Sequence, residues 1–330
     1  MSALVSLDHL SRRFGSIVAV DDLSLSVGVG EVLGFLGPNG AGKTTTMRLI
    51  AGFLEPSGGR ATVGGLDVVR SPIEVKRRLG YLPEGAPIYG DMSARGFLNF
   101  VAAARGLRGD ARRRAIDDVV DKVSLAPVFD QRIDTLSKGF KRRIGLAQAI
   151  VHDPDVLILD EPTDGLDPNQ KYDVRRLIRA MAPGKAIIIS THILEEVEAV
   201  CSRAAIIADG RLVADGTAET LLSRLPRHRS VWVRVPASEA ETARTVLGQL
   251  SDASSLEKER TVDGAVQFWV GGAGGETSVV EVSRRLTAAQ VTIEALSVEH
   301  GRLDDVFRLL TTGQATADAG ADVGENPAHG

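Results

Sequence analysis

An apolar segment that runs into a glycine-rich turn restricts the fold of this chain more than any other feature. Glu31–Leu36 is mainly apolar and is followed by Gly37-Pro38-Asn39-Gly40-Ala41-Gly42-Lys43-Thr44, which matches the pattern of a phosphate-binding loop. In such a loop the glycines let successive backbone N–H groups surround phosphate oxygens, and the following helix turns its positive end toward the same anion. The pattern therefore predicts a buried strand, a phosphate-binding turn and a helix in direct succession.

Two groups of side chains bring chemistry to this turn. Lys43 can reach the β- and γ-phosphates of a nucleotide, and the Thr44 hydroxyl can ligate Mg²⁺. Further along, the apolar run Val156–Leu159 ends in Asp160 and Glu161. Asp160 is suited to hold Mg²⁺ directly or through water, and Glu161 is expected just beyond the strand, where it can orient or polarise an attacking water. Together the two segments predict Mg²⁺-dependent hydrolysis of a nucleoside triphosphate.

Short apolar runs alternate with helical patterns up to about residue 225. Such runs suit strands that are buried on both faces of a largely parallel sheet. They are Glu31–Leu36, Leu79–Leu82, Val156–Leu159, Ala186–Ile189 and Ala204–Ala208. Two helical patterns, Ser93–Arg105 and Asp110–Val123, interrupt the alternation. The sequence thus predicts an α/β P-loop NTPase core in residues 1–225, with a helical insertion at about residues 85–150.

A different pattern begins near Pro226. Strands and helices then follow in the order β-α-β-β-α-β, which is that of a ferredoxin-like α+β domain, expected at residues 229–311. The segments are Ser230–Val235, Ser238–Leu250, Ser255–Arg260, Ala265–Val270, Thr277–Ala289 and Val291–Val298, with a further helix at Leu303–Leu310. Gly271–Gly275 lacks a following Lys-Ser/Thr, so it is expected to be a loop. Residues 312–330 lack an apolar period and are expected to be a disordered tail.

Composition argues against several classes of protein. In the 330 residues, 39 Lys and Arg against 43 Asp and Glu give a formal net charge of −4, so no nucleic-acid partner is expected. The one cysteine, Cys201, allows no intrachain disulfide and fits a reducing compartment. We find no signal peptide at Met1–Val5 and no uncharged apolar run of about 20 residues. The chain is therefore expected in the cytoplasm, with another polypeptide spanning any membrane on which it acts.

A further motif narrows the class of nucleotide-binding protein. Leu136-Ser137-Lys138-Gly139-Phe140 precedes the apolar run at Val156, and here the sequence resembles the ATP-binding subunits of ABC transporters, whose signature is usually Leu-Ser-Gly-Gly-Gln. The resemblance covers about residues 4–222 and includes Phe14, Tyr81-Leu82-Pro83-Glu84, Asp164-Gly165-Leu166-Asp167 and Ser190-Thr191-His192, in the family's order. The segments Leu136–Ala149, Tyr81–Glu84 and Leu303–Thr311 look like those of ATPases that drive ABC-2-type gliding-motility and multidrug exporters.

This resemblance implies an ATP site that two subunits share. ATP would contact Phe14, Val20, Gly37, Pro38, Asn39, Gly40, Ala41, Gly42, Lys43, Thr44 and Thr45 of one copy, and the signature residues Ser137, Lys138 and Gly139 of the other. Mg²⁺ would be held by Thr44, Asp160 and Glu84; catalysis would fall to Glu161, His192 and Lys43, and Asp167 would belong to the D-loop. The implied partners are a second copy or a homologous ATPase subunit in a head-to-tail dimer, and a multi-span ABC-2-type permease that holds the chain at the inner face of the cell membrane.

Simpler roles stay open for several of these residues. Ser137 and Asp167 are also suitable N-caps for helices expected at Phe140–Val151 and Pro168–Met181. Phe14 could lie in the core, and His192 could be a polar residue at the end of a strand. The basic residues of the signature segment could form a solvated helix face; they are Lys138, Lys141, Arg142 and Arg143. The family's usual residues are replaced by Lys138 and Phe140 in the signature and by Glu84 in the Q-loop, and Glu84 adds a negative charge near the phosphates.

The expected function is ATP hydrolysis that drives an exporting permease through dimer closure. Two alternatives remain: a soluble ABC ATPase that acts without a permease, and an ATP-binding regulator with little turnover. If a permease is present, the loop Glu84–Met92 is expected to contact it, because Ile88 and Tyr89 offer apolar side chains there.

Overall fold

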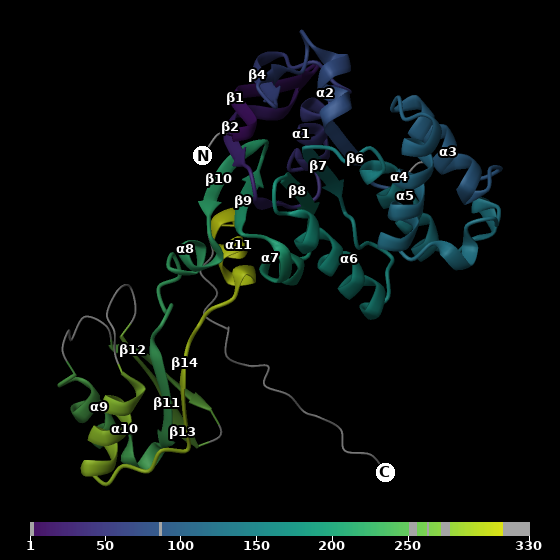
Figure 1. Ribbon diagram of the computed structural model, residues 1–330. Helices are drawn as coiled ribbons and strands as arrows, with labels where there is room; N and C mark the ends of the chain where they lie inside the picture. Colours follow the sequence, from purple (N-terminus) through teal and green to yellow (C-terminus); the bar gives the residue numbers. More distant parts are fainter. Residues whose placement is uncertain (1–2, 86–87, 251–255, 263, 272–277, 313–330) are drawn as a thin grey trace. The chain divides into compact units, whose positions relative to one another are not determined.

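The computed structural model brings the apolar runs of the sequence side by side in one sheet (Figure 1). The structure describes residues 3–85, 88–250, 256–262, 264–271 and 278–312. It divides into two units, Met1–Thr217 and Ala218–Gly330. The boundary predicted near residue 225 falls inside the second unit, because α8 (Ala218–Leu222) packs against α11 (Leu303–Thr312).

A six-stranded sheet with the order β10-β9-β3-β8-β7-β6 forms the centre of the first unit. The strands are β3 (Val32–Leu36), β6 (Leu79–Leu82), β7 (Val156–Asp160), β8 (Ala186–Thr191), β9 (Arg203–Ala208) and β10 (Arg211–Gly216). From β9 to β6 all neighbours are parallel, and β10 is antiparallel to β9. The strands predicted from the apolar runs are confirmed, with small differences at their ends. Because the central strands are parallel, their carboxyl ends lie along one edge of the sheet.

Both faces of this sheet are buried, which explains why its strands are continuous apolar runs. Successive residues of β7 and β8 alternate between two cores: Leu157 and Ile187 belong to one, Ile158 and Ile188 to the other. The helices α1 (Lys43–Ile50), α2 (Pro72–Arg78), α6 (Pro168–Met181) and α7 (Leu194–Val200) belong to the same unit.

A four-stranded antiparallel sheet, in the order β2-β1-β4-β5, was not predicted. Its strands are β1 (Ala3–Phe14), β2 (Ile17–Gly28), β4 (Gly58–Val63) and β5 (Leu66–Asp67). The register between β1 and β2 shifts at several points, for example between Leu7 and Leu10. Each shift breaks the two-residue alternation by which such strands are recognised in a sequence.

The predicted helical insertion consists of α3 (Ala94–Ala104), α4 (Gly109–Lys122) and α5 (Lys138–Ile150), which lie together beside β6 (Figure 1). Short 3₁₀ turns at Ala126–Val128 and Ile133–Thr135 connect α4 to α5. Phe97 and Val119 belong to the same buried cluster as Leu157 on the face of the sheet. The insertion therefore shares a continuous core with the sheet.

The second unit contains a sheet in the order β12-β13-β11-β14, whose neighbours are all antiparallel. Its elements are β11 (Val231–Pro236), α9 (Ala240–Leu247), β12 (Leu256–Val262), β13 (Ala265–Val270), α10 (Val279–Ala288) and β14 (Ala295–Val298), with a 3₁₀ turn at Ala237–Glu239. Val233, Phe268 and Leu286 are fully buried in its core. The expected tail, from residue 313 onward, and most of the loop Gly271–Gly275 lie outside the described residues.

None of the helices in the described ranges combines the length and the apolarity that a membrane span requires.

Stability should depend on pH through His152, which follows α5. Its Nε2 donates to the Leu79 carbonyl at 3.1 Å, and burial lowers its pKa to about 4. An unfolded histidine takes up its proton near pH 6.5, so the free energy of unfolding should fall as the pH drops from about 6.5 to about 4. His152→Gln keeps a donor but cannot titrate in this interval, so the variant should lose less stability across it. Urea denaturation at several pH values would test this, and equal losses in both proteins would contradict it.

Candidate nucleotide site

Four segments of different chemistry meet at the carboxyl edge of the central sheet. The glycine-rich turn follows β3, Glu84 lies just beyond β6, Glu161 follows β7 and His192 follows β8. Since these four strands are neighbours and parallel, their following loops converge, as at many ligand sites of α/β proteins. The loops surround a cavity of about 470 Å³, lined by Ala19, Asn39, Gly40, Gly42, Lys43, Thr44, Thr45, Glu84, Asp160, Glu161, Asp164 and His192.

The turn needs glycine where the chain comes closest to its neighbours. Gly42 has φ 101°, and a Cβ there would lie 2.3 Å from the Ala19 carbonyl oxygen. A Cβ on Gly37 would lie 2.5 Å from the carbonyl oxygen of Ile207. The helix α1 begins at Lys43, directly after the turn, so its positive end lies at the cavity. This arrangement suits an anion such as a nucleotide phosphate.

Lys43 supplies a buried cation to the cavity. Its side chain is 8% exposed, and Nζ donates to the carbonyl oxygens of Gly37 at 2.7 Å and Pro38 at 3.2 Å. Burial lowers the pKa of Lys43, and the charges of Glu161, Asp160 and Glu84 partly oppose that effect.

Asp160 provides the strongest sign of a cation site. It is 1% exposed at the end of β7, and its Oδ2 is buried without a hydrogen-bond partner among the described residues. Such an oxygen is costly unless a ligand or water satisfies it. Thr44 and Glu84 line the same cavity, and their oxygens are of the kind that Mg²⁺ prefers. In the described ranges, no three His, Cys, Asp or Glu residues cluster as metal ligands.

Glu161 and His192 form a pair at the mouth of the cavity. Oε1 of Glu161 accepts from Nδ1 of His192 at 2.9 Å; the carboxylate is 14% exposed and the imidazole 58%. Glu161 has φ 50°, a left-handed conformation that costs on the order of 1–3 kcal/mol in a residue other than glycine. Its N–H donates to the Ser190 carbonyl at 2.8 Å, which helps to hold the turn. A carboxylate fixed in this way is placed to orient a water.

The predicted signature residues and Asp167 of the D-loop lie outside this cavity, whereas Asp164, in the same D-loop segment, lines it. Ser137 caps α5 by accepting from the Phe140 N–H at 3.4 Å, and Asp167 caps α6 by accepting from the Gln170 N–H at 2.9 Å. Both simpler roles therefore hold. Neither residue lines the cavity, and neither do Lys138 and Gly139 at the start of α5.

Some residues that were predicted to contact the nucleotide do not line this cavity; they are Phe14, Val20, Gly37, Pro38 and Ala41. Phe14 is 42% exposed, so a place in the core is excluded; the Arg12 guanidinium lies 4.6 Å from the centre of its ring. Val20 is 1% exposed and packs in the core, while its neighbour Ala19 faces the cavity.

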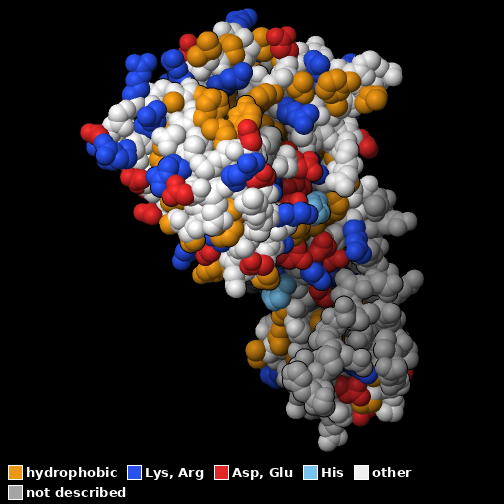
Figure 2. All heavy atoms as spheres, turned by 90° about the vertical axis from the view of Figure 1, so that its right-hand side faces the viewer, with side chains coloured by type: hydrophobic (Ala, Val, Ile, Leu, Met, Phe, Trp, Pro, Cys, Tyr) orange, Lys and Arg blue, Asp and Glu red, His pale blue; other side chains and the backbone are white. Residues whose placement is uncertain are grey.

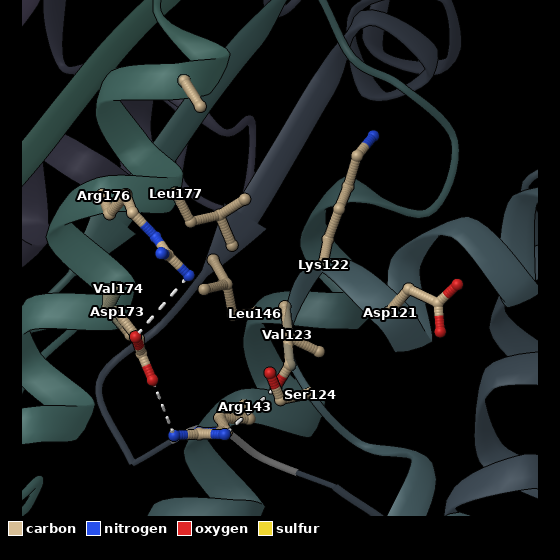
Figure 3. Close-up of a pocket in the computed structure, with 11 residues that line it drawn as sticks. Asp121, Lys122, Val123, Ser124, Arg143, Leu146, Asp173, Val174, Arg176 and Leu177 are labelled. Atoms are coloured by element: carbon tan, nitrogen blue, oxygen red, sulfur yellow. Dashed lines mark hydrogen bonds and ion pairs between the residues drawn. The ribbon is translucent and has the colours of Figure 1, made fainter.

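The idea of a solvated basic face on α5 is wrong for Arg142, which is 6% exposed. The sequence could have indicated that Arg142 is buried, because Gly139, Arg142 and Leu146 are spaced to share one helix face. All three are buried. Arg143 points into a groove of about 360 Å³ between α4, α5 and α6 (Figure 3). There its guanidinium lies 3.6 Å from Asp173 and 3.4 Å from the Val123 carbonyl oxygen.

Glu196, on α7, is another buried residue that sequence reasoning missed. It is 4% exposed and accepts from the hydroxyls of Thr163 and, at 3.3 Å, Thr191. These threonines lie close in sequence to Glu161 and His192, so Glu196 joins the segments that carry the pair.

Comparison with known proteins finds consistent relatives. A family model described as "ABC transporter" matches residues 20–164. The chain is 34% identical to the daunorubicin resistance ATP-binding protein DrrA2 of Streptomyces coeruleorubidus, over 93% of this chain and 94% of that protein. It is 32% identical to the linearmycin resistance ATP-binding protein LnrL of Bacillus subtilis (strain 168), over 93% and 98%. A solved ATP-binding subunit of an ABC transporter is 29% identical, with a TM-score of 0.63 over 67% of this chain and 92% of that one.

Lys43→Ala should weaken ATP binding at least about tenfold, roughly 1.4 kcal/mol, because it removes the cation nearest the expected phosphates. Calorimetric titration of the full chain with ATP and Mg²⁺ would measure this. Lys122→Ala is the matched control, since Lys122 is exposed on α4 and pairs with Asp118. Unchanged affinity in Lys43→Ala would rule out a phosphate-binding role for the lysine.

Proposed function

The chain belongs to the ATP-binding subunits of ABC transporters, and from this premise we propose that it hydrolyses ATP to power an ABC-2-type export permease. The observation that carries the hydrolytic role is the pair of Glu161 and His192, 2.9 Å apart at the cavity of the Lys43 turn. An exporting role is supported by the two resistance ATPases, because the similarity runs over 93% of the chain and so includes the second unit.

Each group at the cavity has a role in this hydrolysis. The N–H groups of the turn and Lys43 hold the β- and γ-phosphates and stabilise the charge that develops on them. Glu161 accepts a hydrogen bond from a water in line with the γ-phosphate, and His192 fixes the carboxylate through Nδ1. When bound at Thr44 and Asp160, with Glu84 nearby, Mg²⁺ supplies charge neutralisation to the phosphate oxygens.

A second copy would complete the site. Ser137, Lys138 and Gly139 lie outside the cavity of their own chain, yet Ser137 opens a helix whose positive end suits a phosphate. In the proposed head-to-tail dimer, this helix end of each copy, or of a homologous ATPase subunit, meets the ATP held by the other. ATP closes the dimer, hydrolysis opens it, and the movement drives the permease at the inner face of the cell membrane.

For residues 229–311 we propose a ferredoxin-like accessory domain that braces the dimer. The element order β-α-β-β-α-β and the strand order β12-β13-β11-β14 support this class. The residues that line the nucleotide cavity all belong to the first unit, which supports an accessory role for the second.

Glu161→Gln should retain ATP binding but lose turnover, because an amide cannot accept the proton that the attacking water gives up. Steady-state hydrolysis should fall at least about a hundredfold, as for removal of a general base, and ATP should trap the dimer on size exclusion. Hydrolysis at the unaltered rate would sink the assignment of Glu161. If the unaltered chain itself binds ATP but turns over negligibly with its permease, a regulator becomes the better description.

The aromatic surface formed by Tyr89 and Phe100 should bind the permease. The two side chains are 57% and 52% exposed, with ring centres 5.9 Å apart. Figure 2 shows that hydrophobic side chains are exposed on the face of the first unit that is seen there. Ile88 is half-buried against the core, so Tyr89 is the better probe. Tyr89→Asp should weaken co-purification with the permease at least about tenfold and leave ATP affinity unchanged.

The matched control for this surface is Val280→Asp, which changes an exposed apolar residue on α10. Normal co-purification of Tyr89→Asp would remove this surface from the proposal. Normal activity with no permease in the cell would favour the soluble alternative.

A further inference from the structure

A buried arginine lies behind the nucleotide cavity without lining it. Arg142 stands in the second turn of α5, the helix that Ser137 caps, and is 6% exposed. It is absent from the residues that line the cavity. A guanidinium is seldom buried unless it is paired, so its hydrogen bonds indicate what it does.

The hydrogen bonds of Arg142 go to backbone carbonyls on both sides of Glu161. Nη2 donates to the Asp160 carbonyl oxygen at 2.7 Å, and Nε donates to that of Pro162 at 3.3 Å. Glu161 itself has φ 50°. A strained residue of this kind persists only where its surroundings determine the backbone, and Arg142 bonds to the residue before it and the residue after it.

A third bond from the same guanidinium reaches another wall of the cavity. Nη1 donates to the Pro83 carbonyl oxygen at 3.5 Å, next to Glu84 in the chain. One planar group thus connects α5 with the segments that follow β7 and β6. The fork geometry of arginine permits this, because its donors point in fixed and different directions.

The positive charge of Arg142 also interacts with the acidic residues of the site. Burial lowers its pKa, whereas Asp164, Asp160, Glu161 and Glu84 oppose that effect. These four carboxylates line the cavity together with the buried Lys43. Arg142 therefore balances part of their charge from behind, without occupying space that the phosphates need.

We infer that Arg142 is a positioning residue that sets the turn of Glu161, and with it the rate of hydrolysis, while leaving ATP binding unaffected. This inference rests on the proposed hydrolytic role of Glu161. It also gives α5 a direct link to the catalytic carboxylate, since one side chain joins the helix behind Ser137 to both neighbours of Glu161.

Arg142→Gln in the full chain tests the inference. Turnover should fall at least about tenfold, because the variant loses the guanidinium hydrogen bonds to the backbone on both sides of Glu161. ATP affinity should change by less than about twofold, because the groups that contact the phosphates are kept. Arg142→Lys is the second variant: it keeps the buried charge but not the fork, so its turnover should remain low. Arg143→Gln is the matched control, since the neighbouring arginine points into the groove of Figure 3, and its turnover should be unchanged.

A double-mutant cycle separates positioning from a general loss of structure. In the Glu161→Gln background, Arg142→Gln should add no further loss to the residual turnover, because there is no longer a carboxylate to position. An additive loss, full turnover of Arg142→Gln or Arg142→Lys, or a loss of ATP affinity as large as the loss of turnover would each overturn the inference. Full turnover of Glu161→Gln alone would instead overturn the proposed function on which it rests.

Discussion

The site depends on the parallel pairing of four neighbouring strands. In the order β3-β8-β7-β6, every carboxyl end reaches the same edge of the sheet, so each following loop delivers a different group to one cavity. An antiparallel strand among them would turn its loop to the opposite edge. Parallel pairing in turn requires burial on both faces, which the two hydrophobic cores provide. The convergence of functional groups at the carboxyl edge therefore depends on the burial of both faces of the sheet.

Local sequence carries most of what positions the site. The strand, turn and helix from Val32 to Ile50 are predictable from the sequence. At Gly37 and Gly42 the backbone lies too close to neighbouring carbonyl oxygens to admit a side chain, so few other conformations fit this glycine pattern. The start of α6 is predictable because Asp167 and Pro168 together mark a helix N-terminus. The pair of Glu161 and His192 follows from two apolar runs that end in polar residues, once the strands are known to be neighbours.

The parts that escaped prediction depend on contacts distant in sequence. The sheet of β1 and β2 loses its alternation at the register shifts, which only the pairing of the strands reveals. Arg142 reads as one of several basic residues, and its burial depends on carbonyls of two other segments. The expected contacts of Phe14 and of the signature involve ATP or a second copy of the chain, so those roles remain predictions.

The left-handed backbone of Glu161 lowers the stability of the folded protein, whereas the carboxylate of the same residue is needed for the proposed function. Asparagine tolerates φ near 50° better than glutamate, and glycine adopts it without strain. Either residue would relax the turn while removing the carboxylate, so a more stable protein could be one that no longer works. Selection for stability alone would then favour replacement of Glu161, whereas selection for activity would retain it. In a set of stabilised variants, position 161 would be a sensitive indicator of whether activity was selected as well.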